Sequence, residues 1–387
     1  MNKIKYPLAS STWDQKEIEA IHKVIDSGMY SMGKHVKDFE KKFASHIGSK
    51  YAIMVNSGSS ANLLMIASLF FTKIAKLKRG DEVIVPAVSW STTYIPLQQY
   101  GLKLRFVDID INTLNIDLNM LERSITKKTK MIFLVNLLGN PNDFDRINDI
   151  IGDKEIFFIE DNCESLGAKY NDKSAGTFGL MGSFSSFFSH HICTMEGGLV
   201  VTDDEELYHI MLSLRAHGWT RNLPDINCVT GKKDDNEFNE SFNFVLPGFN
   251  LRPLEIEGAI GAIQLDKLNS LIDERRKNAE IYKNAMDNHS DIMIQAEIGE
   301  SSWFGFSMII KKNSSLTRKD FIEKLNSNGF ETRPIVAGNF TRNPVLKYFN
   351  YEIPFKLKNA DFLHDNGLFI GNHHFPLNSA INELTNI

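Results

Sequence analysis

The chain has 387 residues, 42% of them hydrophobic and 24% charged, which is typical of a globular protein with one large and one smaller domain. Its formal net charge of −5 gives no basic footprint for nucleic acid or an anionic membrane, and no apolar run approaches the ~20 residues of a transmembrane helix. Three widely spaced cysteines favour a reducing compartment over a disulfide framework, so we expect a cytoplasmic protein.

Helical and β-rich segments alternate through the first 200 residues. The apolar spacing predicts helices from Trp13 to about Ile47, broken near Gly28 and Gly33. A helix is also expected from residue 61 to about residue 71. Strands are expected at residues 51–55, 82–85, 103–107, 131–135, 156–159 and 199–202. Because most of these strands are separated by stretches long enough for helices, the pattern predicts an α/β fold with a mostly parallel, helix-covered sheet.

The pattern changes in the second half of the chain. Residues 227–243 are polar and are expected to form an exposed loop. A long helix is expected from Leu254 past Lys277, followed by a strand at 303–310 and a helix at 318–326. These elements predict a large α/β domain with an N-terminal helical segment over residues 1–255. A linking helix and a small C-terminal α+β domain are expected over residues 256–387.

Two polar groups follow predicted strands. Gly58 and Ser59 lie between a strand and a helix, where unpaired N–H groups can bind an anion such as phosphate, although both residues also serve as helix caps. Asp161 follows an apolar run, and a carboxylate at that end of a strand points into the cleft where open α/β sheets bind ligands. A metal ligand or a helix cap is an equally good interpretation of Asp161 alone.

A longer motif covers residues 183–198, SFSSFFSHHICTMEGG. Here a serine–phenylalanine stretch leads to His190, and Glu196 with two glycines follows six positions later. The motif resembles the cofactor-lysine signature of the sugar aminotransferase/dehydratase (DegT/StrS-type) family of fold type I enzymes, which use pyridoxal 5′-phosphate (PLP). In that family a lysine stands where this chain has His190. Further family blocks occur in order along nearly the whole chain, and together they imply the type I fold with a smaller C-terminal α+β domain.

The resemblance assigns roles to individual residues. It implies that Asp161 pairs with the pyridine nitrogen of PLP, that Trp90 stacks on the ring and that Ser185 binds the phosphate. It also implies that Asn250 reaches the phosphate of the neighbouring subunit's cofactor, which requires a homodimer with shared active sites. Substrate contacts are expected from four residues: His217, Arg221, Arg252 and Arg333. For the tryptophan, a place in the core, and for the arginines, a place on the surface, are the alternatives.

Two departures from the family pattern bear on the chemistry. The imidazole of His190 cannot hold PLP covalently as a lysine amine does, but it moves protons near neutral pH. Glu164 stands where a glutamine commonly contacts the phenolic oxygen of PLP. We expect Glu164 to orient His190 and favour its charged form for proton transfer. A degenerate site that has lost catalysis is the alternative.

These departures favour dehydration over transamination. The resemblance implies removal of the C3 hydroxyl of a GDP-4-keto-6-deoxy sugar, with PLP converted to pyridoxamine 5′-phosphate (PMP) by L-glutamate and ammonia released. The expected setting is the colitose pathway of bacterial surface polysaccharide. A sugar 4-aminotransferase and a non-catalytic sugar-nucleotide-binding protein remain alternatives. Because three scattered cysteines cannot supply four thiolates, we expect no iron–sulfur cluster and no metal.

Overall fold

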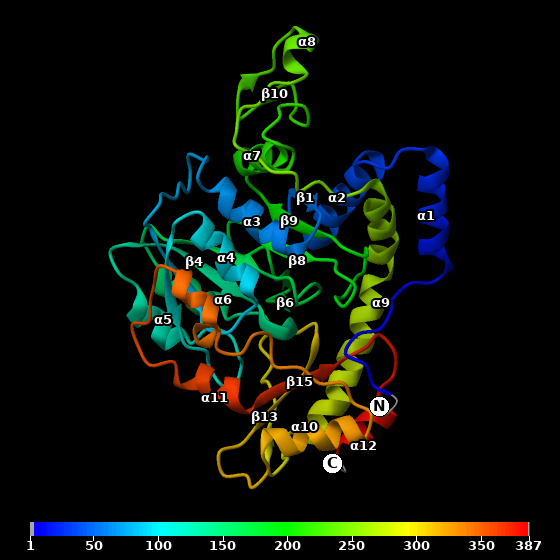
Figure 1. Ribbon diagram of the computed structural model, residues 1–387, viewed down its shortest axis with the longest axis vertical. Helices are drawn as coiled ribbons and strands as arrows, with labels where there is room; N and C mark the ends of the chain where they lie inside the picture. Colours follow the sequence, from blue (N-terminus) through cyan, green and yellow to red (C-terminus); the bar gives the residue numbers. More distant parts are fainter. Residues whose placement is uncertain (1–3, 386) are drawn as a thin grey trace.

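The computed structural model describes residues 4–385 and 387. Its centre is an eight-stranded sheet (Figure 1). In spatial order the strands are β1 (Tyr51–Val55), β9 (Gly198–Thr202), β8 (Gly182–Ser185), β5 (Phe157–Asp161), β4 (Thr129–Val135), β2 (Glu82–Pro86), β3 (Lys103–Val107) and β14 (Tyr351–Glu352). All strands of this sheet except β9 run in one direction, so the predicted mostly parallel sheet is confirmed for the described residues.

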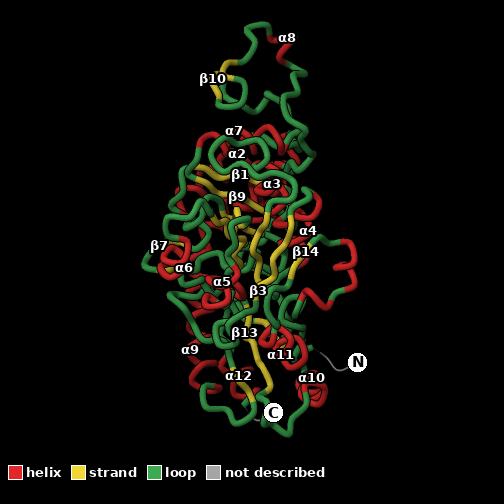
Figure 2. Tube along the Cα trace, turned by 90° about the vertical axis from the view of Figure 1, so that its left-hand side faces the viewer, coloured by secondary structure: helices red, strands yellow, loops and turns green. Residues whose placement is uncertain are grey.

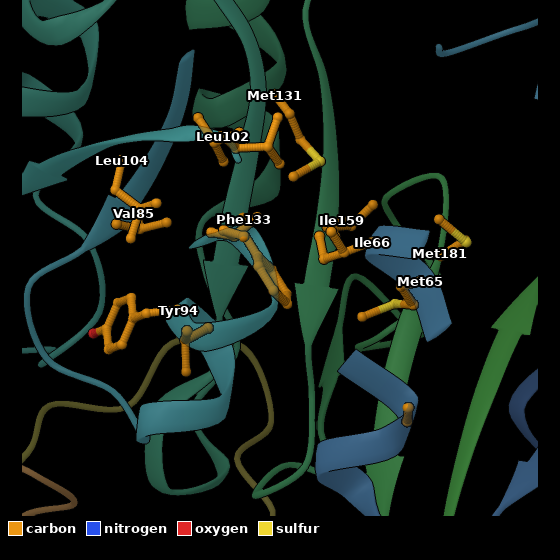
Figure 3. Packing of buried hydrophobic residues seen from close by; sticks show 14 of the residues in the cluster. Met65, Ile66, Val85, Tyr94, Leu102, Leu104, Met131, Phe133, Ile159 and Met181 are labelled. Atoms are coloured by element: carbon orange, nitrogen blue, oxygen red, sulfur yellow. The ribbon is translucent and has the colours of Figure 1, made fainter. Parts of the chain in front are cut away.

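Alternate strand residues pack into cores on opposite faces of this sheet, as the two-residue period of a strand requires. On one face Phe133 packs with Met65 and Tyr94 from two covering helices (Figure 3). On the other face Ile132 and Phe158 belong to a separate apolar cluster. Burial on both faces explains why these strands read as continuous apolar runs in the sequence.

Helices precede and alternate with the strands of the large sheet along the chain, as predicted. They are α1 (Gln15–Ser27), α2 (Lys34–Ile47), α3 (Gly58–Ser68), α4 (Ser91–Gln99), α5 (Leu118–Ser124), α6 (Phe144–Ile151) and α7 (Glu205–Arg215). The break between α1 and α2 is confirmed, and Gly28 ends α1 in the left-handed conformation with φ 68°. The expected start of α3 at residue 61 is wrong, because the Ser57 hydroxyl caps the helix by accepting from the Ser60 N–H. Neither α7 nor β8 was expected.

A second, antiparallel sheet lies below the first (Figures 1 and 2). It contains β12 (Ile292–Met293), β13 (Gly305–Ile310) and β15 (Gly367–Gly371). The nearby helices are α10 (Arg318–Ser327), α11 (Lys358–Asn366) and α12 (Asn378–Leu384), and three 3-10 turns lie at Leu137–Gly139, Phe340–Arg342 and Pro344–Tyr348. The long helix α9 (Glu255–Met286) runs alongside both sheets (Figure 1). Because β14 returns to the large sheet, the domain boundary near residue 255 stays a prediction.

Residues 224–246 form an arm that projects from the body beyond α7 (Figures 1 and 2). The expected exposed loop is part of this arm, where it forms a short hairpin of β10 (Ile226–Asn227) and β11 (Gly231–Lys232) and the one-turn helix α8 (Glu237–Glu240). Phe238 and Phe242 of the arm are 87% and 71% exposed. A second hairpin, β6 (Lys169–Tyr170) and β7 (Lys173–Ser174), lies elsewhere on the body. None of the helices in the described part of the chain has the length and apolar character that crossing a bilayer requires.

Candidate active site

A cavity of about 540 Å³ opens where the parallel strands of the large sheet end. Its walls come from the starts of α3 and α4, the segments after β4, β5 and β8, and parts of the chain beyond α9. Ligands of open α/β sheets bind in this position. Eight of the predicted site residues line the cavity: Gly58, Ser59, Trp90, Asp161, Glu164, Ser185, His190 and Arg333.

One wall presents donors for a phosphate. Gly58 and Ser59 form the first turn of α3, where N–H groups have no partner within the helix and the dipole favours an anion. Ser185 ends β8 and lies directly against this turn. A Cβ atom on Gly58 would approach the Ser185 Cβ to 2.6 Å, so the glycine is what allows the two segments to meet. Backbone donors and a hydroxyl together suit a phosphate group.

Asp161 is the last residue of β5, and 6% of it is exposed. Its Oδ2 accepts hydrogen bonds from Asn62 Nδ2 and Thr93 Oγ1, both at 2.8 Å. Its Oδ1 accepts the Cys163 N–H at 3.2 Å and no other donor among the residues that the structure describes. A buried carboxylate held by donors can receive one more proton donor, such as a protonated pyridine nitrogen.

Trp90 caps the start of α4 and keeps 57% of its surface exposed while lining the cavity. An indole in that position can stack on a planar ring. The predicted phosphate donors, the carboxylate Asp161 and this aromatic ring therefore surround one space. This donor set fits PLP, because the first turn of α3 could bind its phosphate, Trp90 could stack on its ring and Asp161 could pair with its ring nitrogen.

His190 lies in the turn that joins β8 to β9, where its N–H donates to the Phe187 carbonyl at 2.9 Å. Its ring packs between Phe187 and Phe304, with centroid distances of 6.1 and 5.2 Å. The Nδ1 atom is buried and has no hydrogen-bond partner within residues 4–385 and 387. Burial lowers the pKa of His190 to about 4, and the nearby Arg275 cation acts in the same direction. The imidazole is therefore neutral at pH 7 and able to accept a proton.

The expected pairing of Glu164 with His190 is not formed among the described residues. Instead, Glu164 Oε2 accepts the N–H of Leu138 at 3.0 Å. Burial raises the pKa of Glu164 to about 7, and the charge of Asp161 adds to this effect. The prediction that such a pair keeps His190 charged is also wrong, because burial lowers the pKa of His190. Both side chains still line one cavity.

Four predicted residues lie outside the cavity of their own chain: His217, Arg221, Asn250 and Arg252. They surround Trp219 at the base of the arm. The Trp219 ring is 4.9 Å from the His217 ring, and it has the guanidinium groups of Arg221 and Arg252 at 5.8 and 6.0 Å. Arg252 Nε donates to Asn250 Oδ1 at 3.0 Å. The structure does not bring these four residues into the cavity of their own chain, so their contacts with cofactor and substrate stay predictions.

Two residues that contact Asp161 were missed in the sequence. Asn62 is a polar residue in the apolar turn Ala61–Met65 of α3, and a buried amide in such a helix needs a hydrogen-bond partner. An amide among apolar helix residues was therefore a signal in the sequence that could have identified Asn62. Thr93 gave no comparable signal, since a threonine near the start of α4 reads as an ordinary helix residue. The aromatic walls Phe304 and Phe369 come from distant segments and were also missed.

The cysteines do not form a cluster. Cys163, Cys193 and Cys228 are all free, and of the three only Cys163 lines the cavity. Across residues 4–385 and 387, no three or more His, Cys, Asp or Glu residues are grouped so that they could hold a metal ion.

Known proteins resemble this chain over its full length. Residues 11–379 match the model of the DegT/DnrJ/EryC1/StrS aminotransferase family. A GDP-4-keto-6-deoxy-D-mannose 3-dehydratase from Yersinia pseudotuberculosis is 63% identical over 385 residues, which cover 99% of this chain and 98% of the relative. The solved structure of E. coli GDP-4-keto-6-deoxy-D-mannose 3-dehydratase with bound hydrated PLP is 62% identical and has a TM-score of 0.99, covering 100% of this chain and 99% of that one.

A second solved structure, a GDP-4-keto-6-deoxymannose 3-dehydratase with a trapped PLP–glutamate geminal diamine, is also 62% identical. Its TM-score is 0.98, and the match covers 99% of each chain. The predicted fold of the PLP-dependent type I enzymes is therefore confirmed. The chain belongs to the DegT/DnrJ/EryC1/StrS aminotransferase family.

Proposed function

We propose that this protein removes the C3 hydroxyl of GDP-4-keto-6-deoxy-D-mannose in a PLP-dependent reaction that consumes L-glutamate. The product is GDP-4-keto-3,6-dideoxy-D-mannose. The observation that carries the proposal is a neutral, half-buried histidine at the position of the family's lysine, in a cavity that otherwise fits PLP. The 63% identity to a dehydratase of this specificity supports the substrate.

The cofactor would be held without a covalent bond. The first turn of α3 and Ser185 would bind its phosphate, Trp90 would stack on its ring, and Asp161 would keep the ring nitrogen protonated. When bound, PLP and its amino form PMP supply an electron sink at the sugar's C4, which makes the neighbouring C3 hydroxyl a leaving group. Arg333 at the rim of the cavity would contact the sugar nucleotide.

His190 would move the protons. A neutral imidazole accepts a proton as a general base, and the imidazolium that results can return a proton to the departing C3 hydroxyl. The apolar rings of Phe187 and Phe304 hold the imidazole and keep it free of competing hydrogen bonds. A lysine amine in this place would be able to add a proton to the sugar and complete amine transfer. The histidine therefore directs the reaction toward elimination.

The overall reaction balances without another redox partner. Replacing the C3 hydroxyl by hydrogen consumes two electrons and releases one water molecule. Oxidation of glutamate to 2-oxoglutarate with loss of ammonia supplies those two electrons and consumes one water molecule. One glutamate is therefore used, and one ammonia is released, for each sugar converted.

A small panel of nucleotide sugars tests this proposal. The protein is incubated with PLP, glutamate and each 4-keto sugar, and the products are identified by mass spectrometry. The expected product has lost oxygen at C3 and contains no additional nitrogen. A stable 4-amino sugar that retains the C3 hydroxyl would instead identify a sugar aminotransferase. Binding without any conversion would identify a non-catalytic sugar-nucleotide-binding protein.

We further propose that two subunits form each active site. Support comes from the group at the base of the arm, which includes Asn250 and Arg252 and lies outside its own cavity. The neighbouring aromatic residues Phe238, Phe242 and Phe244 are 54–87% exposed, as expected for a surface that a second copy covers. In such a homodimer, Asn250 reaches the phosphate of the partner's cofactor.

The cellular setting follows from the substrate class. We propose a cytoplasmic enzyme, since glutamate and nucleotide sugars are available there and all three cysteines are free. Its product suits colitose formation for the O-antigen of lipopolysaccharide. Assay of the colitose content of surface polysaccharide after gene deletion tests this assignment.

A further inference from the structure

A buried chain of hydrogen bonds ends on Asp161. Ser183 Oγ donates to Asn62 Oδ1 at 2.6 Å, and Asn62 Nδ2 donates to Asp161 Oδ2 at 2.8 Å. From the other side, Thr93 Oγ1 donates to the same Oδ2 at 2.8 Å and lies 2.7 Å from Ser89 Oγ. All four of these partners are at most 2% exposed. The chain links β8, α3 and α4 to the end of β5.

The direction of each hydrogen bond is determined by its neighbours. Thr93 has a single hydroxyl proton and gives it to Asp161, so the hydroxyl of Ser89 must donate to Thr93. Ser183 donates to the carbonyl oxygen of Asn62, an interaction much shorter than its 3.4 Å contact with the Glu160 carbonyl. The amide must therefore present its NH₂ group to Asp161. Every side chain that contacts Asp161 Oδ2 is a donor, which suits an ionised carboxylate.

The two oxygens of Asp161 differ in what they can still accept. Among the described residues, Oδ2 has two side-chain donors, whereas the one donor to Oδ1 is the Cys163 N–H, at a long 3.2 Å. A carboxylate oxygen can accept two hydrogen bonds, so Oδ1 keeps capacity for one more. Since Asp161 lines the cavity, that remaining capacity is available to a bound ring.

We propose that Asn62 and Thr93 are positioning residues that lock Oδ2 and thereby aim Oδ1 of an ionised Asp161 at the ring nitrogen of PLP. The proposal rests on the PLP-binding role of the cavity. It gives α3 a second role, in addition to the binding of phosphate at its N-terminal turn. One helix would then act at both ends of the cofactor, with its first residues at the phosphate and Asn62 acting on the ring nitrogen through Asp161.

The test measures protonation of the ring nitrogen directly. The whole protein is loaded with PLP labelled with ¹⁵N in the ring, and the ¹⁵N chemical shift is followed from pH 6 to pH 9. Thr93→Val keeps the shape of the side chain and removes the donor, and Asn62→Leu removes the amide donor. We expect the pyridinium signal to persist across this range in the starting protein. In either variant at least half of this signal should be lost between pH 6 and pH 9, with PLP bound about tenfold more weakly.

Three further variants separate this role from a purely structural one. Thr93→Ser keeps the hydroxyl, so its ¹⁵N chemical shift should depend on pH as it does in the unsubstituted protein. Ser68→Ala removes another buried hydroxyl of α3, which donates to the Met65 carbonyl, and should change neither the shift nor PLP affinity. Asp161→Asn should abolish the pyridinium signal and so calibrates the assay. Circular dichroism establishes that each variant is folded before it is loaded.

Unchanged titrations in folded Thr93→Val and Asn62→Leu would overturn the proposal. Equal loss in Thr93→Val and Thr93→Ser would also overturn it, because the effect would then follow the shape of the residue and not its hydroxyl. If the starting protein bound no PLP at all, the proposed function itself would fail. That outcome is distinguishable, because it appears before any substitution is made.

Discussion

The half-buried position of His190 between two aromatic rings predicts an unusual dependence of the rate on pH. With a pKa of about 4, roughly 3% of the imidazole is protonated at pH 5.5, whereas a histidine of pKa 6.5 would be about 91% protonated there. The fraction of neutral base at pH 5.5 then differs about tenfold between the two cases. Once Glu164 has been replaced by glutamine, the protein should therefore keep nearly all of its kcat/KM at pH 5.5.

The assay is a profile of kcat/KM from pH 5 to pH 9, because this ratio reports the ionisation of the free enzyme. Occupancy by PLP is measured by absorbance at each pH and used to correct the rates. Glu164 also titrates in this range, with a pKa of about 7, so the profile is repeated with Glu164→Gln. The charged or titratable groups near His190, Arg275 and His191, are the same in both proteins. A difference between the two profiles therefore comes from Glu164.

An acid limb with a midpoint near pH 6.5 in both proteins would refute the argument. It would mean that the environment of Phe187 and Phe304 does not keep His190 neutral. A midpoint near pH 7 that disappears in Glu164→Gln would assign the limb to Glu164 instead. The predicted result is a flat profile to pH 5.5 once Glu164 has been replaced.

Three further results are expected. Burial raises the pKa of Glu164 to about 7 from 4.5, so in the PLP-free protein its contribution to stability is lost as pH rises from about 4.5 to 7. Glu164→Gln should therefore stabilise that protein by about 1–3 kcal/mol at pH 8 and by little at pH 4.5, as urea unfolding measures. Borohydride treatment should leave no pyridoxyl adduct on the starting protein, whereas His190→Lys should yield one by mass spectrometry and lose dehydration. Asn250→Ala should weaken PLP binding by about 1.5–3 kcal/mol without unfolding, and mixed dimers with His190→Asn should retain at most one working site.

Much of the fold was predictable because its strands are buried on both faces. Apolar runs such as 131–135 and 156–159 lie within two residues of the observed β4 and β5. β8 was not predictable in this way, since Gly182–Ser185 contains two serines and a glycine and no aliphatic residue. Its extended form comes from pairing with β5 and β9 on either side. Local propensity is overridden there by tertiary pairing.

The candidate site was predictable where a short motif carries its own physical reason. The turn at Gly58 and the carboxylate at the end of β5 are of this kind, and both line the cavity. The partners of Glu164 were not predictable, because they depend on the fold of the turn at Leu138, which lies 26 residues away in sequence. The same holds for Thr93, whose contact with Asp161 depends on how α4 packs beside β5. Sequence motifs thus locate the groups, and packing decides which of them interact.

The most direct test of the proposed dehydration follows hydrogen and nitrogen through one reaction in heavy water. The released product must gain a proton at C3 from solvent, so deuterium should appear at C3, with one 2-oxoglutarate and one ammonia formed for each sugar converted. His190→Asn should stop this elimination while PLP still binds, because the amide is a poor base at neutral pH. A 4-amino sugar that keeps its C3 hydroxyl, with no ammonia released and no deuterium at C3, would contradict the proposed reaction.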